Sequence, residues 1–243
     1  MKIRELLCLF MVSIFMSCGV LPHKNNFYET QKNVELGVIG VKKKSVHKTD
    51  FEEIGIPNYE NLIKISLIEK NFTKKIYNQY LKAIKNKKVL NSVKYIDSIE
   101  NKPKYFEINL NDKVEVINAI NSNSLLFNYL KKTPEAKIVT SLRFVAPKSL
   151  SNKLLSADAF YLTTDNQKKQ RLYIYKNQSK IGEIDMSKND VFAYKKASFC
   201  WMVTDRKKLK LATILEEGET CKNATNKNVE KLEKELTKST FKF

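Results

Sequence analysis

The sequence predicts an α+β protein, in which several helices pack against one antiparallel sheet. Extended runs separated by turn-forming residues fill much of the second half of the chain, as in an antiparallel meander. Other segments repeat their apolar residues every three or four positions, which is the period of an amphipathic helix. The hydrophobic content of 42% and the aromatic content of 10% are those of a globular chain. We therefore expect one folded core.

Changes of composition divide the 243 residues into three parts. Residues 1–17 have the pattern of a signal peptide, residues 18–57 that of a tether, and residues 58–243 that of a single α+β domain. Within the tether, the near-alternate spacing of Val34, Leu36, Val38 and Val41 is compatible with one short strand.

The leader has a basic start and a short apolar run. Lys2 and Arg4 precede residues 6–16, which are apolar except for Ser13. This run of 11 residues is shorter than the roughly 20 that a helix needs to span a membrane. A secretory signal peptide is therefore favoured over a permanent transmembrane anchor.

The end of the leader resembles the lipobox of bacterial lipoproteins, with Phe15, Met16, Ser17 and Cys18 in its four positions. Phe15 departs from the leucine that is usual at the first position. The resemblance implies cleavage before Cys18, attachment of acyl chains such as palmitate to this residue, and a place in the cell envelope. Because Gly19 is not acidic, we expect the periplasmic side of the outer membrane. The alternative is an ordinary signal peptide that ends near a cysteine.

The first element of the domain is predicted to be a long amphipathic helix from about Asn58, interrupted near Asn71. Its apolar residues recur at intervals of three and four, which places them on one helical face. They are Leu62, Ile65, Ile68, Phe72, Ile76, Tyr80 and Ile84. Such a helix, with lysines on its other side, could lie on a membrane, but an apolar stripe of this width favours the core.

The remaining elements are predicted from the helical and the alternate spacing of their apolar residues. We expect a hairpin of 93–96 and 105–110, helices at 114–120 and 125–130, and a strand at 137–145. An antiparallel meander should follow, with strands at 159–164, 172–175, 180–184, 191–194, 198–203 and 209–215. A final helix is predicted at 228–238.

Cys200 and Cys221 are the cysteines that remain after processing, besides Cys18. Two cysteines in an exported domain favour a disulfide bond. The alternative is a buried free thiol at Cys200, beside Trp201.

The formal net charge of +18 suggests an anionic partner. Only four of the 44 basic residues are arginine, whereas the readers of nucleic acids depend on the planar arginine fork. We therefore predict no nucleic-acid partner. The abundance of lysine could also reflect the base composition of the coding DNA, and we favour that explanation over a dedicated polyanion site.

Missing residue types exclude several chemistries. No histidine follows His47. A catalytic triad therefore lacks its histidine base, and a zinc site built on histidine lacks its ligand, unless the tether folds back. After residue 55 only Gly182 and Gly218 remain, so the glycine-rich loops that bind nucleotides are missing. We expect neither a cofactor nor a metal.

Carboxylates could still act in catalysis. Glu216, Glu217 and Glu219 follow a predicted strand and are weak candidates for calcium ligands or for an acid/base pair. We favour an exposed acidic turn instead, because no calcium-loop spacing accompanies them. A serine–lysine nucleophile pair also stays open, but the sequence does not locate it.

These observations lead to two main functional hypotheses. The first is a non-catalytic lipoprotein, held in the membrane by Cys18, that binds an envelope protein or an anionic glycan or lipid surface. The second is a lipid-anchored hydrolase, which requires a pocket with two carboxylates or a serine beside a lysine of lowered pKa. A third reading is an accessory or immunity-type lipoprotein that blocks another protein.

Overall fold

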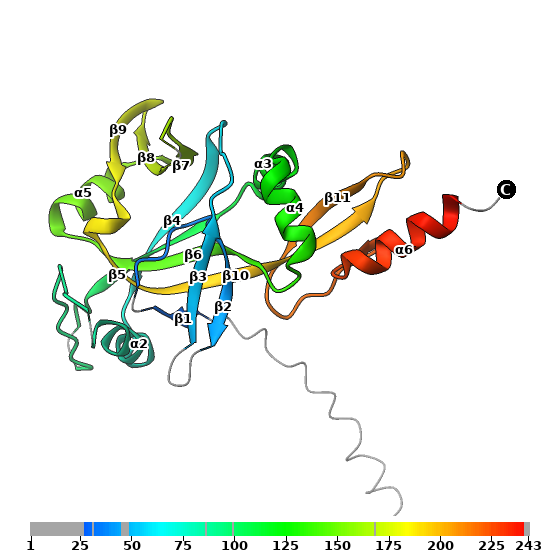
Figure 1. Ribbon diagram of the computed structural model, residues 1–243. Helices are drawn as coiled ribbons and strands as arrows, with labels where there is room; N and C mark the ends of the chain where they lie inside the picture. The colour runs from blue at the N-terminus through cyan, green and yellow to red at the C-terminus, as the bar shows by residue number, and fades with distance from the viewer. Residues whose placement is uncertain are drawn as a thin grey trace, which may run out of the picture.

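The computed structural model describes residues 27–30, 32–44, 49–85, 87–98, 100–167 and 169–240. These residues form five α-helices and one open antiparallel sheet of twelve strands (Figure 1). The α+β class predicted from the sequence is confirmed.

The strands are β1 (Tyr28–Glu29), β2 (Ile39–Lys44), β3 (Thr49–Gly55), β4 (Ile63–Asn71), β5 (Lys104–Leu110), β6 (Lys137–Val145), β7 (Ala159–Thr164), β8 (Gln170–Lys176), β9 (Ser179–Ile184), β10 (Asp190–Val203), β11 (Leu209–Leu215) and β12 (Thr225–Asn226). The helices are α2 (Lys74–Ile84), α3 (Lys113–Ser122), α4 (Ser124–Lys132), α5 (Lys148–Ser156) and α6 (Val229–Thr240). A short 3-10 helix spans Met186–Lys188.

Strand β10 organises the sheet. It has 14 residues and pairs with β1, β6, β11 and β12. The main path runs β1-β10-β6-β5-β4-β7-β8-β9, and the β2–β3 hairpin joins it by pairing Ile39 with Ile138 of β6. In Figure 1 the far half of β10 extends with β11 to one side, and α6 lies beside them.

The register separates two faces of the central strands, because residues directly opposite each other share a face. Phe106 pairs with Phe144 and Ile108 with Leu142, and all four side chains belong to the main core. The intervening residues point the other way. The opposite face is therefore free to carry polar side chains.

Helix α2 covers part of this opposite face. Thr73 begins the helix by accepting a hydrogen bond from the Ile76 N–H. Its Tyr80 joins Phe72, Tyr105 and Phe192 in a cluster of buried rings, and the centroids of Phe72 and Tyr105 lie 5.0 Å apart. These aromatic contacts hold α2 against the sheet.

Several predicted elements have the expected bounds. Strands β6, β7 and β11 match the predictions residue for residue. The two short helices are present as α3 and α4, and the side chains of Asp112 and Asn123 cap them. The last helix is α6.

The long helix predicted from Asn58 is wrong in its first half. Residues 63–71 form β4, in which Ile63 and Ile65 are buried at alternate positions. Leu62 and Ile68, which we placed on the apolar face, are 45% and 46% exposed. The sequence fits both the helical spacing of three to four residues and the alternate spacing of a strand. Pairing of β4 with β5 and β7 stabilises the strand.

Two further predictions need correction. Residues 93–96 form no strand, and β5, the expected second strand of that hairpin, pairs with β4 and β6 instead. The expected meander is interrupted, because β7, β8 and β9 pair in succession but β10 pairs with β6 rather than with β9. The strands predicted at 191–194 and 198–203 are parts of this single strand β10.

Part of the segment that we assigned to a tether lies in the folded domain. Strands β2 and β3 fall within residues 18–57. Val34, Leu36, Val38 and Ile39 are at most 2% exposed and belong to the main core. The alternate residues Val34, Leu36 and Val38 therefore mark core contacts rather than an isolated strand in a tether.

Candidate anion-binding face

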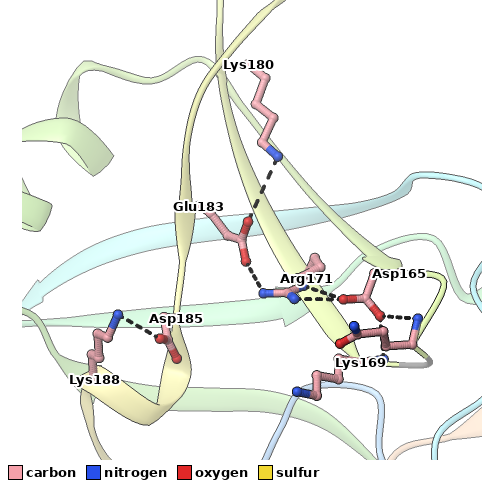
Figure 2. A network of polar contacts seen from close by, with 8 residues as sticks. Asp165, Lys169, Arg171, Lys180, Glu183, Asp185 and Lys188 are labelled. Carbon is pink, nitrogen blue, oxygen red and sulfur yellow. Dashed lines mark hydrogen bonds and ion pairs between the residues drawn. The ribbon is translucent and has the colours of Figure 1, made fainter.

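Charged side chains on the β7–β9 part of the sheet are paired with one another. Arg171 contacts Asp165 Oδ2 at 2.7 Å through Nη2 and Glu183 Oε1 at 2.9 Å through Nη1 (Figure 2). Lys188 lies 3.3 Å from Asp185 Oδ2 in the same view. Arg171 and Lys188 are therefore each paired with a carboxylate, so neither offers an unpaired charge to a partner.

Positive charge is in excess where β1, β2, β6 and β10 meet. Four lysines come together there, although they are far apart in the sequence: Lys42 of β2, Lys137 of β6, Lys196 of β10 and Lys227 after β12. We call these four residues the basic face. The side chains of Lys42, Lys196 and Lys227 make no hydrogen bond or ion pair with any residue that the structure describes.

The pairing of the strands explains how the basic face forms. Lys137 sits opposite Gly40 of β2, two residues before Lys42. Lys196 pairs with Val139, so it lies beside the start of β6. β12 pairs with β10 through Asn226, which places the next residue, Lys227, at the same end of β6.

The charges of these lysines act on one another. Burial lowers the pKa of Lys196, and the charges of Lys42 and Lys137 lower it further. Burial also lowers the pKa of Lys137, followed by the charge of Lys227. Glu217 offsets part of both effects. The lysines therefore repel one another in a partly dry environment, which an anion would relieve.

Tyr28, Glu217 and Ser198 complete the surroundings of the basic face. The Lys196 Nζ lies 4.1 Å from the centre of the Tyr28 ring, a cation–π geometry. The Tyr28 hydroxyl donates a hydrogen bond to Glu217, and burial together with this carboxylate raises the pKa of Tyr28 to about 12. Lys137 Nζ donates to Ser198 Oγ at 2.7 Å.

The three glutamates that the sequence indicated as candidates each accept a hydrogen bond from a different group. Glu216 accepts hydrogen bonds from Lys113 at 2.7 Å and from Thr140 at 3.3 Å. Glu219 Oε2 accepts one from the Glu216 N–H at 2.9 Å, and Glu217 contacts Tyr28. Among the described residues, no group of three or more acidic, histidine or cysteine side chains is placed to hold a metal ion.

The disulfide predicted from the cysteine count is present. The Sγ atoms of Cys200 and Cys221 are bonded at 2.01 Å, and the bond ties β10 to the chain that precedes β12 and α6. Cys18, the expected lipid attachment site, lies outside the described residues, as do His23 and His47. No helix in the described ranges is long and apolar enough to cross a membrane.

A cavity of about 470 Å³ lies beside α3. Glu60 and Glu115 line it together with several asparagines, and Asn58 and Asn61 donate hydrogen bonds to these carboxylates at 3.0 and 3.3 Å. The cavity gathers two carboxylates, and the sequence had not singled them out.

Comparison with known proteins assigns no family to this chain, because no family model, curated protein or solved structure matches it.

Proposed function

We propose that this protein is a lipid-anchored protein of the cell envelope, held by Cys18, whose domain is a non-catalytic binding module. In this proposal the basic face binds the anionic groups of an envelope partner or of a glycan or lipid surface. The supporting observation is the convergence of Lys42, Lys196 and Lys227, whose side chains form no ion pair with a described residue, while Glu217 offsets only part of the charge of the basic face.

The chemistry of the basic face suits a diffuse anionic surface. Lysine is a compact point charge on a flexible stem, so it binds phosphate and sulfate without fixed geometry. Two of the lysines are exposed, Lys42 and Lys227, whereas Lys196 is half-buried. This mixture allows contact over a broad area and does not require a closed pocket.

The proposed anchor lies close to the basic face along the chain. Tyr28 belongs to the surroundings of Lys196 and follows Cys18 by ten residues. Ten residues span at most about 35 Å when fully extended. A lipid on Cys18 would therefore hold the basic face near the membrane.

Heparin fragments serve as a soluble polyanionic probe of this proposal. The variant Lys42→Gln, Lys196→Gln, Lys227→Gln should bind them about a hundredfold more weakly, since each lysine near an anionic surface contributes about 1 kcal/mol. Binding of the wild-type chain should weaken steeply with salt. Calorimetric titration at several salt concentrations measures both effects.

A matched control removes the same charge elsewhere. Lys148, Lys153 and Lys176 are exposed and lie on α5 and at the end of β8. The corresponding triple glutamine variant should bind heparin as the wild type does. An equal loss in both variants would show that net charge, and not the basic face, drives binding.

The hydrolase hypothesis has two observations in its favour, the cavity beside α3 with its two carboxylates and a contact between a serine and a lysine. Ser198 accepts a hydrogen bond from Lys137, whose pKa is lowered by burial and by Lys227, so the pair has the composition of a serine–lysine nucleophile. Against it, Ser198 lies within β10 and pairs there with Leu215 of β11. The register of β10 shifts at Lys195/Lys196 and at Cys200/Trp201 but not at Ser198, and a paired strand position offers no turn at which backbone N–H groups converge to form an oxyanion hole.

Labelling with a fluorophosphonate probe separates the two functions. A hydrolase of this kind should be modified at Ser198, and Ser198→Ala should abolish the modification. A binding module should remain unlabelled, and Ser198→Ala should leave its affinity for heparin unchanged.

A further inference from the structure

A second group of cations lies on the sheet face opposite the main core, and it includes none of the four lysines of the basic face. Register places Ser66, Asn109, Ser141 and Lys195 in one row across β4, β5, β6 and β10. The next row holds Ile68, Glu107, Arg143 and Ala193. Four strands thus present polar side chains side by side.

Arg143 is held rigidly in this second row. Its Nε donates a hydrogen bond to Glu107 Oε2 at 3.0 Å, and its guanidinium carbon lies 3.5 Å from the centre of the Phe27 ring. The side chain is only 10% exposed. Ion pair and aromatic ring together fix the plane of the guanidinium group.

The outer nitrogens of Arg143 keep their capacity to bind. Neither Nη1 nor Nη2 donates a hydrogen bond to a residue that the structure describes. Some described side-chain atoms are fully buried and lack a hydrogen-bond partner, but neither of these two nitrogens is one of them. A planar pair of donors of this kind matches an oxygen pair of a phosphate or carboxylate group.

The local charge is positive. Lys70 lies 3.1 Å from Glu107, and Lys195, which makes no ion pair with a described residue, lies 4.6 Å from the Phe27 ring centre. Three cations, Lys70, Arg143 and Lys195, therefore face one carboxylate, an excess of two positive charges. Glu216 and Glu29, which stands opposite Ala193 in the second row, do not change this excess, because they are paired with Lys113 and Lys82.

We propose that Arg143 and Lys195 form a binding site for a phosphate-type oxyanion, with Glu107 and Phe27 as positioning residues. A divalent anion would neutralise the excess of charge, Arg143 would supply its two free donors, and Lys195 would supply the ammonium group. The half-buried Ser66 and Asn109 and the 46% exposed Ile68 border the site, so a ligand approaches over β4 and β5. This site is separate from the basic face and does not depend on its function.

The test titrates the mature chain with inorganic phosphate at constant ionic strength. Calorimetry should give saturable binding to one site, and acetate should bind more weakly because it carries one charge. Lys195→Gln should reduce the affinity for phosphate about tenfold, the contribution of one charge-assisted hydrogen bond. Lys176→Gln, an exposed lysine of β8, should bind as the wild type does.

Two further variants sharpen the test. Arg143→Lys keeps the charge but removes the planar fork, so it should also weaken phosphate binding. The triple variant of the basic face should lose heparin binding and keep phosphate binding. The proposal is overturned if phosphate shows no saturable binding, if Lys195→Gln binds it unchanged, or if acetate binds equally well.

Discussion

Glu107 shows how a single buried residue organises its surroundings. Its side chain is 7% exposed and contacts both Arg143 and Lys70. Burial by itself would raise the pKa of this carboxyl, but the hydrogen bond and charge of Arg143, and then those of Lys70, hold the pKa below its ordinary value. Glu107 is therefore ionised at neutral pH and is the counter-charge of both Arg143 and Lys70.

Glu107→Gln should destabilise the protein at pH 7 by about 3–5 kcal/mol, because it leaves a buried arginine without its counter-charge. The stabilisation by an ionised Glu107 is fully present above the pKa of the unfolded carboxyl. It is lost as the pH falls through the lower pKa of the folded state. Urea unfolding at pH 7 and at pH 3 should therefore give a smaller difference between wild type and variant at the lower pH.

Glu52→Gln is the control for this prediction. Its partner Lys43 lies at 3.2 Å, but both side chains are more than half exposed. An exposed pair of this kind contributes less than about 1 kcal/mol. A similar loss of stability in both variants would contradict the role assigned to burial at Glu107.

The residue pattern predicted the disulfide bond, but it did not predict which lysine and serine lie in contact. The pairing of Cys200 with Cys221 followed from a count of cysteines in a chain that we expect to be exported. The contact of Lys137 with Ser198 joins residues 61 positions apart on different strands. In a chain rich in both residue types, only the register of β6 and β10 selects this pair.

At the scale of elements, the disulfide links β10 to the segment that leads into β12 and α6. It closes a loop with a sequence separation of 21. Reduction, or replacement of both cysteines by alanine, should lower the free energy of unfolding by about 3 kcal/mol, mainly by freeing the unfolded chain. Urea unfolding with and without reductant measures this, and an unchanged midpoint would contradict it.

The edge of β11 is covered by one side chain of α3. Asn121 donates to the Leu211 carbonyl at 3.0 Å and accepts from its N–H at 2.9 Å, so it occupies both backbone groups of an edge strand. Asn121→Ala should cost about 1–3 kcal/mol, because these groups lose their partners. The exposed Asn118 on the same helix provides the control, and thermal unfolding should leave Asn118→Ala within about 0.5 kcal/mol of the wild type.

Elements with one clear period were predicted well, and elements with two competing periods were not. All but the first residue of β6, Lys137, are buried, and β-branched and apolar residues make up most of the strand. The chain from 62 to 71 satisfies both the helical and the extended spacing, and only its neighbours β5 and β7 settle the matter. Helix α5 was missed because serines interrupt its leucines and only Leu154 is buried.

The distribution of charge matters more for the whole molecule than the total of +18. Cations are paired around Arg171, in excess around Arg143, and unpaired on the basic face. Composition predicted a basic protein, but we favoured a bias of the coding DNA as the explanation. The convergence of four lysines depends on the order of the strands, which the sequence pattern did not predict.

The account depends most on the claim that this domain is held at a membrane by Cys18. The most direct test is the mass of the N-terminal peptide of the protein extracted from native envelope without reduction. We predict a peptide that begins at Cys18 and carries two or three acyl chains, together with a peptide pair linked through Cys200 and Cys221. A peptide that begins at Met1, or an unacylated Cys18, would contradict the account.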